Sequence, residues 1–359
     1  MSYSKINFTP GPSQLYFTVE DHMKQAFRDG IPSLSHRSKK FESIYAEAVT
    51  GLRQLLNLPS DYHLYFTGSA TEIWERTVQN LVGETSFHLV NGSFSKRFFE
   101  ISAQLGKNAK KHEVEAGEGF SHSLEVPPST ELIAITHNET SSGVSLPLDF
   151  IYSFKTKHPN VLLVVDAVSS LPYPDFDYSK LDSVFFSVQK GFGLPAGLGV
   201  WMVNDKCLAK AEQLISKGQT IGSYHNLPTL HSHALKNQTP ETPNVLGIYL
   251  LGKVVSDMLR HSVHKIRKET EYKSFLLYNT LKKHSHLKAF VKDETFQSRT
   301  VMVVDSGDLT EKVTKSLLEK GMQPGDGYGS AKKHQLRFAN FPTHAKEHFE
   351  LLVDTLESM

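Results

Sequence analysis

The chain has 359 residues, of which 39% are hydrophobic and 21% charged, a composition typical of a soluble globular protein with room for two domains. Its 39 Lys and Arg residues balance 38 Asp and Glu residues, so no basic excess favours nucleic acid or a membrane surface as a partner. The single cysteine, Cys207, excludes an intrachain disulfide and a cysteine-based metal cluster.

The N-terminal stretch MSYSKINFTPGPS lacks the apolar segment of a signal peptide, and no apolar run reaches transmembrane length. We therefore expect a cytoplasmic protein that has no membrane partner. Residues 1–15 are interpreted as an arm that packs on the remainder of the chain.

Short apolar runs alternate with segments of helical period through the first two thirds of the chain. The expected strands are HLYFT (63–67), SFHLV (86–90), LIAIT (132–136), VLLVVD (161–166), SVFFSV (183–188) and GVWMV (199–203). Helical spacing falls between several of them, at 71–82, 94–105 and 148–157. This alternation predicts an α/β fold with a mostly parallel central sheet flanked by helices, in which ligands collect at the carboxyl ends of the strands.

A proline-containing segment, NQTPETPN (237–244), interrupts this pattern. Long helices are expected after it, at 245–260 and 264–283, with a break at His261 and Ser262. The rest of the chain mixes expected strands and helices, at 301–305, 309–320, 335–341 and from about Thr343. We predict a large domain over residues 16–261 and a smaller α+β domain over residues 262–359.

The stretch SVFFSVQKGFGLPAGLGVWMV (183–203) places Lys190 between two strand-like runs. A buried ammonium is costly unless it is paired or neutralised, whereas a lysine in such a place can instead react with a carbonyl group. The glycines that follow would let the backbone approach a bulky group. Taken alone, Lys190 is better explained as the first residue of a surface loop, so other features of the chain must decide.

Asp166 ends the most apolar run of the chain and lies 24 residues before Lys190. A carboxylate in this place either caps the next turn or pairs with a cation, such as a protonated pyridine nitrogen. Because both residues end successive strand-like runs, we expect them at the same edge of the sheet.

Three turns that follow other expected strands carry further candidates. TGSAT (67–71) joins a strand to a helix, and it either aims backbone N–H groups and the helix dipole at a phosphate or is an ordinary capped turn. Phe94, in NGSF, either stacks on a flat ring or anchors the core. Thr140, in HNETSSGV, either bonds a ring substituent or caps its turn.

In this order, the motifs TGSAT, NGSF, HNETSSGV, VVDAVSS, SVQKGFGLPAGLG and N-x-TP resemble those of a class V pyridoxal-phosphate aminotransferase, an enzyme of fold type I. SHR (35–37), the Gln-Lys pair and the spacing between Asp166 and Lys190 are most similar to phosphoserine aminotransferases. The resemblance extends from TPGPS (9–13) to LRFANF (336–341), which is nearly the whole chain.

The resemblance implies pyridoxal 5′-phosphate as the cofactor and assigns residues to it. Lys190 would form the covalent link to it and Asp166 would face its pyridine nitrogen, and both would be catalytic. The other cofactor-binding residues would be Ser69, Ala70, Thr71, Phe94, Thr140, Gln189, Asn237 and Thr239. Thr239 would reach the cofactor of a partner subunit, which implies a homodimer, and Gln238 remains an alternative to Asn237.

The resemblance also implies contacts with the substrate. Arg337 would hold the α-carboxylate, since a guanidinium binds a carboxylate in a bidentate fork. His36 and Arg37 would bind a substrate phosphate. The bacterial pattern has a C-terminal His-Arg pair where this chain has Ser330 and Ala331. The basic residues that follow either supply the missing charge or form a solvated cluster: Lys332, Lys333 and His334.

The implied reaction is amino-group transfer between O-phospho-L-serine and 2-oxoglutarate, a step of serine biosynthesis. The nearest alternative is a serine– or alanine–glyoxylate aminotransferase, which DAVSS and HNETSSGV also suit. A cysteine desulfurase is disfavoured because Cys207 lies in an expected helix. The joint presence of Lys190, Asp166, Thr140 and the phosphate turn argues against a cofactor-free binding protein. The His pairs lack fixed acidic or cysteine partners, so no metal site is expected.

Overall fold

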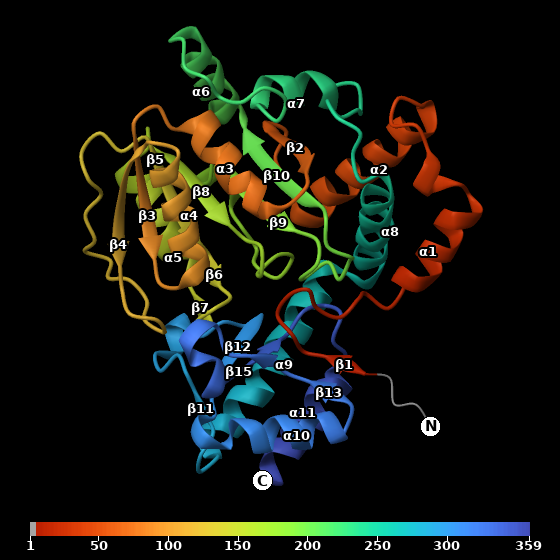
Figure 1. Cartoon of the computed structure of the whole chain (residues 1–359), viewed down its shortest axis with the longest axis vertical. Coiled ribbons are helices and arrows are strands. Elements are labelled where there is room, and N and C mark those ends of the chain that lie inside the picture. Colours follow the sequence, from red (N-terminus) through yellow and green to blue (C-terminus); the bar gives the residue numbers. More distant parts are fainter. Residues whose placement is uncertain (1–4) are drawn as a thin grey trace.

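A seven-stranded sheet forms the centre of the computed structural model, which describes residues 5–359 (Figure 1). Its order is β2-β10-β9-β8-β5-β3-β4, and every strand runs in the same direction except β10. The prediction of a mostly parallel sheet is therefore confirmed. The strands are β2 (Tyr62–Thr67), β3 (Thr85–Val90), β4 (Asn108–Glu113), β5 (Leu132–Thr136), β8 (Leu162–Asp166), β9 (Ser183–Ser187) and β10 (Gly199–Asn204).

Helices cover both faces of this sheet (Figure 1). Because side chains alternate along a strand, Val184 and Phe186 of β9 pack on one face and Phe185 packs on the other. This double burial explains why the central strands read as continuous apolar runs. The first face is covered by α1 (Val19–Arg28), α2 (Lys39–Leu56), α5 (Leu148–Lys157) and α8 (Val245–His261), and the second by α3 (Ala70–Leu81), α4 (Ser93–Gln104), α6 (Asp205–Ser216) and α7 (Leu227–Ala234).

The C-terminal part of the chain has a second sheet, of order β11-β12-β15-β14, with a hydrophobic core of its own. Its strands are β11 (Lys288–Ala289), β12 (Val301–Asp305), β14 (Gly325–Asp326) and β15 (Gln335–Ala339), and its helices are α9 (Val263–Lys283), α10 (Thr310–Glu319) and α11 (Lys346–Glu357). Short 3₁₀ helices lie at Ile31–Ser33, Tyr178–Lys180, Glu294–Phe296, Gly307–Leu309 and Gly329–Lys333. Helix α8 ends at His261 and α9 begins at Val263, where the sequence predicts a break.

Strand β4 has no counterpart among the strands expected from the sequence. Its residues, NAKKHE, are polar and mostly exposed, and it pairs only with β3 at the edge of the sheet. Charged side chains on an edge strand disfavour pairing with other chains. An apolar pattern could not reveal this strand because it buries almost nothing.

The N-terminal arm contacts both sheets (Figure 1). Strand β1 (Ile6–Asn7) pairs in parallel with β13 (Met322–Gln323) in the C-terminal part. The arm then crosses to the central sheet, where the Ser13 N–H donates to the Gln189 carbonyl at 3.1 Å. Another small ladder, β6 (Asn138–Glu139) with β7 (Val144–Ser145), follows β5. Within residues 5–359, no helix is both long enough and apolar enough to span a membrane.

A buried ion pair lies at the amino ends of the parallel strands, on the opposite side of the central sheet from their carboxyl ends. The Lys155 ammonium of α5 is 2.6 Å from the Asp182 carboxylate, which also accepts bonds from the Leu163 N–H at 2.8 Å and the Asn204 amide at 3.0 Å. One carboxylate therefore connects a helix and two strands. Removing one partner of such a pair leaves a buried charge uncompensated.

We predict that Asp182→Asn lowers the stability of the chain by about 3 kcal/mol, because the Lys155 charge loses its counter-ion. The measurement is the shift in the midpoint of urea unfolding. The matched control is Asp205→Asn, because Asp205 pairs with His63 but its side chain is 69% exposed. The control should cost less than about 1 kcal/mol. Equal shifts in the two variants would contradict the interpretation.

Candidate active site

A cavity of about 120 Å³ opens at the carboxyl ends of the parallel strands. The fold brings together eight of the residues predicted to bind the cofactor, and all of them line this cavity: Ser69, Ala70, Thr71, Phe94, Thr140, Asp166, Gln189 and Lys190. They lie at or after the carboxyl ends of five strands, β2, β3, β5, β8 and β9, as expected for an open parallel sheet. The lining also includes residues that the sequence analysis does not assign: Trp74, Thr136, Asn138, Val168 and Ser187.

Lys190 lies in the turn between β9 and β10, and it is only 7% exposed. Its ammonium donates to the Thr140 hydroxyl at 3.3 Å and lies 5.2 Å from the centre of the Phe94 ring. Burial lowers the pKa of Lys190 to about 8, although the Asp166 carboxylate acts in the opposite direction. The lowered pKa increases the fraction of uncharged amine near neutral pH relative to an exposed lysine, and the uncharged form is the nucleophile. The alternative of a surface-loop lysine is wrong.

The N-terminal arm packs directly on the side chain of Lys190. Gly11 has a φ of +146°, and a Cβ atom at this position would lie 2.8 Å from Cε of Lys190. A glycine is therefore needed here both for the backbone conformation and for the close approach. Through Gly11 and Ser13, the arm closes one side of the lysine.

Asp166 is 3% exposed at the end of β8. Its carboxylate accepts hydrogen bonds from the Trp74 indole N–H at 2.8 Å and from the Val168 N–H at 2.9 Å. Burial raises the pKa of Asp166 to about 6, against the effect of these bonds and of Lys190. The carboxylate caps its turn and also faces the cavity, so the two interpretations of its role are compatible. A cation in the cavity would stabilise its charged form.

Trp74 is a positioning residue that the sequence analysis overlooks. It lies three residues after Thr71, and residues at this spacing share one face of a helix. A tryptophan on the sheet-facing side of α3 was therefore a signal that it approaches the neighbouring strand ends.

The turn before α3 is arranged as an anion site. The Ser69 hydroxyl caps the helix by accepting from the Glu72 N–H at 3.1 Å, and the Ala70 N–H donates to the Ser187 hydroxyl at 2.9 Å. The amino end of this 12-residue helix is directed at the cavity and carries partial positive charge. This geometry suits a phosphate group.

Three buried oxygen atoms of the lining have no hydrogen-bond partner among residues 5–359. They are Thr136 Oγ1, Asn138 Oδ1 and Gln189 Oε1. Buried polar atoms are rarely left unpaired, so these atoms indicate a ligand with polar substituents or ordered water. Together with Lys190 and Asp166, they form a donor and acceptor set that fits pyridoxal 5′-phosphate.

Glu139 holds the start of α4 and thereby Phe94. Its buried carboxylate accepts from the Ser95 N–H at 2.8 Å, from the Ser141 hydroxyl at 2.6 Å and, more weakly, from the Phe94 N–H at 3.4 Å. A carboxylate at the amino end of a helix is stabilised by the helix dipole. The neighbouring Thr140 is fixed in turn by its bond to the Ser169 hydroxyl at 2.8 Å.

Arg337 approaches the cavity from strand β15 without lining it. Its guanidinium donates to the Asp326 carbonyl at 2.6 Å and to the Thr140 carbonyl at 3.2 Å. Its central carbon lies 5.4 Å from the centre of the Tyr328 ring. Burial lowers the pKa of Arg337, but the group stays a cation placed beside Thr140.

The remaining predicted residues form a second cluster outside the cavity: His36, Arg37, Asn237 and Thr239. The Arg37 guanidinium donates to the Thr239 carbonyl at 2.8 Å and to the Gln238 amide oxygen at 3.0 Å. The same chain therefore does not bring these residues to Lys190. Their grouping was not foreseen from the sequence, because residues 37 and 239 are far apart along the chain.

The structure separates Ser330 and Ala331 from the basic residues that follow them. Ser330 and Ala331 line a cleft of about 780 Å³ that also includes Tyr328 and Lys96. Lys332 and Lys333 instead line another groove, and the Lys332 ammonium is 3.3 Å from the Asp326 carboxylate. This placement favours the solvated-cluster interpretation for the two lysines. In the described part of the chain, His, Cys, Asp and Glu side chains do not form a group of three that could hold a metal.

We predict that Asp166→Asn lowers the pKa of Lys190 below about 8, because the carboxylate that favours the ammonium is lost. The pKa is measured in the ligand-free chain from the pH dependence of Lys190 acetylation, followed by mass spectrometry of its peptide. The control is Asp205→Asn, because the Asp205 side chain is exposed and lies on the side of the sheet away from the cavity. An unchanged or raised pKa in the Asp166 variant would refute the prediction.

The fold and sequence of the chain match those of known proteins. A solved phosphoserine aminotransferase, SerC from Cytophaga hutchinsonii ATCC 33406, matches with a TM-score of 0.97 and 51% identity over 99% of this chain and 98% of that one. A putative phosphoserine aminotransferase from Mycolicibacterium vanbaalenii is 29% identical over 312 residues, 86% of this chain and 83% of its own. Alanine–glyoxylate aminotransferase from Nostoc sp. covers 100% of this chain and 96% of its own with a TM-score of 0.78, but at 21% identity it shares only the fold.

A family model agrees with these matches. The model described as Aminotransferase class-V matches residues 6–325, which include the cavity and most of the N-terminal arm. The resemblance inferred from the motifs is confirmed by this match. The chain therefore belongs to the class-V aminotransferase family.

Proposed function

We propose that this protein transfers an amino group between O-phospho-L-serine and 2-oxoglutarate, using pyridoxal 5′-phosphate. The observation that carries the proposal is the placement of Lys190, Asp166 and the amino end of α3 around one buried cavity. The 51% identity over nearly the whole length to a solved phosphoserine aminotransferase supports this choice of substrate.

The lining residues suggest how the cofactor would be held. Lys190 would bond its carbonyl carbon, and the Asp166 carboxylate would keep its pyridine nitrogen protonated. The turn at residues 69–71 would bind its phosphate, and Phe94 would stack on its ring. When bound, the cofactor supplies an electron sink for the negative charge that develops at the substrate Cα.

Lys190 would also carry the proton. When its amine is not bonded to the cofactor, Lys190 would lie in a buried site, and burial lowers the pKa of its amine. Such an amine can accept the Cα proton and deliver it to the carbon to which Lys190 had been bound. Thr140 orients the amine, and Arg337, beside Thr140, is placed to hold the substrate carboxylate.

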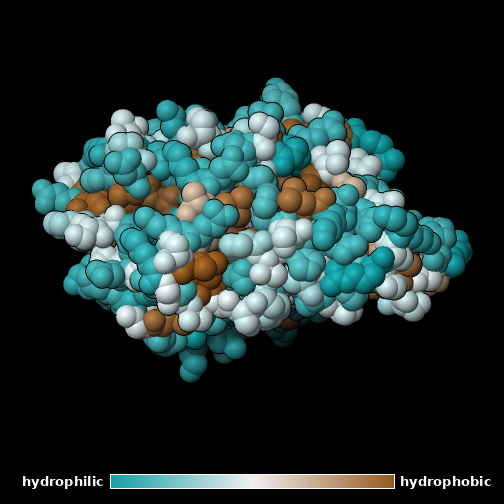
Figure 2. All heavy atoms as spheres, turned by 90° about the horizontal axis from the view of Figure 1, so that it is seen from above, coloured by the Kyte–Doolittle hydropathy of each residue, from teal (hydrophilic) through white to brown (hydrophobic). Residues whose placement is uncertain are grey.

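We propose a homodimer, in which the cluster of His36, Arg37, Asn237 and Thr239 contributes to the cavity of the partner subunit. In support, the Arg37 guanidinium and Thr239 carbonyl are bonded to each other but lie outside their own cavity. The surface in Figure 2 is largely hydrophilic with separate hydrophobic patches. Large apolar side chains are exposed near this cluster and just after the arm, including Leu235 at 74% and Phe17 at 72%. Such side chains are suited to burial against a second copy.

A glyoxylate-type aminotransferase is the second candidate. The observation that favours it is the cleft beside Arg337, where Ser330 and Ala331 supply no charge for a substrate phosphate. Phosphoserine recognition would then depend on His36 and Arg37, with Lys96 as a further cation of the cleft.

We predict that Lys190→Ala abolishes transamination while the fold persists, because both the covalent link and the proton carrier are removed. Turnover is followed as glutamate formation from 2-oxoglutarate and phosphoserine, and folding by circular dichroism. The control is Lys253→Ala, because Lys253 is partly exposed and does not line the cavity. Normal turnover in the Lys190 variant would overturn the assignment.

The substrate is tested with half-reactions, in which single amino acids convert the bound cofactor to its amine form. We predict fast conversion by phosphoserine and glutamate and slow conversion by serine and alanine. Arg37→Gln should raise the concentration needed for phosphoserine by roughly tenfold or more relative to glutamate, because a charged hydrogen bond is lost. Fast conversion by serine or alanine with phosphoserine inert would instead support the glyoxylate-type enzyme.

A further inference from the structure

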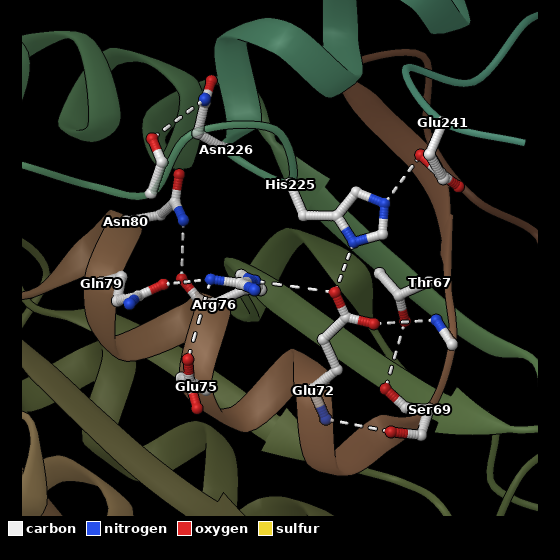
Figure 3. Close-up of polar contacts among 12 residues, drawn as sticks. Thr67, Ser69, Glu72, Glu75, Arg76, Gln79, Asn80, His225, Asn226 and Glu241 are labelled. Carbon is white, nitrogen blue, oxygen red and sulfur yellow. Dashed lines mark hydrogen bonds and ion pairs between the residues drawn. The ribbon is translucent and has the colours of Figure 1, made fainter.

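His225 links two segments that the proposed function places in different roles (Figure 3). Its side chain is 3% exposed and lies between two carboxylates. Nδ1 is bonded to Glu72, and Nε2 is 2.8 Å from the Glu241 carboxylate. Ionised carboxylates only accept hydrogen bonds, so both ring nitrogens donate and the ring is an imidazolium.

At one end of this bridge, Glu72 holds the turn before α3. Its carboxylate accepts from the Gly68 N–H at 2.9 Å, and its own N–H donates to the Ser69 hydroxyl at 3.1 Å (Figure 3). Glu72 directly follows Thr71. A shift of Glu72 would therefore move the N–H groups that face the cavity.

At the other end, Glu241 belongs to the loop of the second cluster. Its carbonyl accepts from the Thr239 hydroxyl at 2.8 Å, and the Thr239 carbonyl accepts from Arg37 at 2.8 Å. The bridge of Glu72, His225 and Glu241 thus connects the phosphate turn to residues 237–241. Nothing in the proposed reaction requires His225 itself.

The charges around His225 favour its protonated form. Burial alone would lower the pKa of His225, but the bonds to Glu241 and Glu72 raise it to about 9. Without that proton, one of the two carboxylates would face a ring lone pair. The other titratable or charged groups that act on this bridge are Arg76 beside Glu72, Glu75 beside Arg76, Tyr224 in tilted ring contact with His225, and His36 and Tyr45 near Glu241.

We propose that the His225 imidazolium is a positioning residue, which locks the phosphate turn to the 237–241 loop and thereby sets the affinity for the cofactor phosphate. The inference rests on the proposed function, because it takes residues 69–71 as the phosphate site. The pKa of His225 is raised in the folded state. The protonated ring therefore contributes its full stabilisation of the folded chain below the ordinary histidine pKa of 6.5, and this contribution is lost as the pH rises through about 9.

The test compares His225→Gln with the wild-type chain, using pyridoxamine 5′-phosphate as the probe. This compound carries the phosphate and the ring but has no carbonyl group to react with Lys190. Its dissociation constant is measured by calorimetry with the full chain after removal of bound cofactor. We expect His225→Gln to weaken binding by roughly tenfold or more near neutral pH, as for a lost charged hydrogen bond. His63→Gln, which removes a His–Asp contact at 2.7 Å elsewhere on the surface, should bind like the wild type.

The pH profile separates a charged bridge from simple packing. The ratio of the two dissociation constants, variant over wild type, should fall toward one above pH about 9, where wild-type His225 also loses its proton. A ratio of one near neutral pH, or a constant ratio at every pH, would overturn the inference. Failure of the wild-type chain to bind the probe would overturn the proposed function and the inference with it.

A second variant keeps the proposal testable if His225→Gln does not fold. Glu241→Gln keeps the ring and removes only one carboxylate, whose side chain is 29% exposed. It should weaken binding of the probe less than His225→Gln does. It should also lower the pH at which the effect of the His225 proton on binding is half lost, because Glu241 contributes to the raised pKa of His225. An unshifted midpoint would contradict a role for this carboxylate in the bridge.

Discussion

The separation of two buried, opposite charges governs the structure around the cavity. Asp166 ends strand β8 and Lys190 lies in the turn after the neighbouring strand β9. Each bonds to other groups: Asp166 to Trp74 and Val168, and Lys190 to Thr140. Burial therefore acts on both pKa values, raising one and lowering the other. Burying two charged groups that do not pair with each other costs free energy, and a bound group that interacts with both would offset this cost. The site is thus prepared for a ligand that is electrophilic at one end and cationic at the other.

The supporting contacts come from rigid elements, so the cavity is shaped before any ligand arrives. Glu139 fixes the amino end of α4 and Ser69 that of α3, and both helices pack against the central sheet. Residues placed in this way lose little further conformational freedom on binding. Thr140 is also held in place before a ligand binds, because its hydroxyl is hydrogen-bonded to both Ser169 and Lys190.

The sequence was sufficient for features that depend on burial or on motif order. The central strands were predicted because helices cover both of their faces, which makes each strand a continuous apolar run. Lys190 and Asp166 were assigned from the order and spacing of the motifs, since neither residue was decisive alone. Features that depend on contacts between distant segments were not predicted. The Arg37–Thr239 contact and the polar strand β4 leave no local pattern in the chain. The position of Trp74 on its helix indicates that it approaches the strand ends, but it does not identify Asp166 as the partner.

The N-terminal arm connects the C-terminal part of the chain to the surroundings of Lys190. It is paired to the C-terminal part through β1 and β13, and it touches the side chain of Lys190 through Gly11. Arg337 of strand β15 makes a second connection, through the carbonyl of Thr140. Two contacts thus lead from the C-terminal part of the chain to the surroundings of the Lys190 amine. A displacement of the C-terminal part would therefore act on the surroundings of Lys190 from two sides, through Gly11 of the arm and through the Thr140 carbonyl.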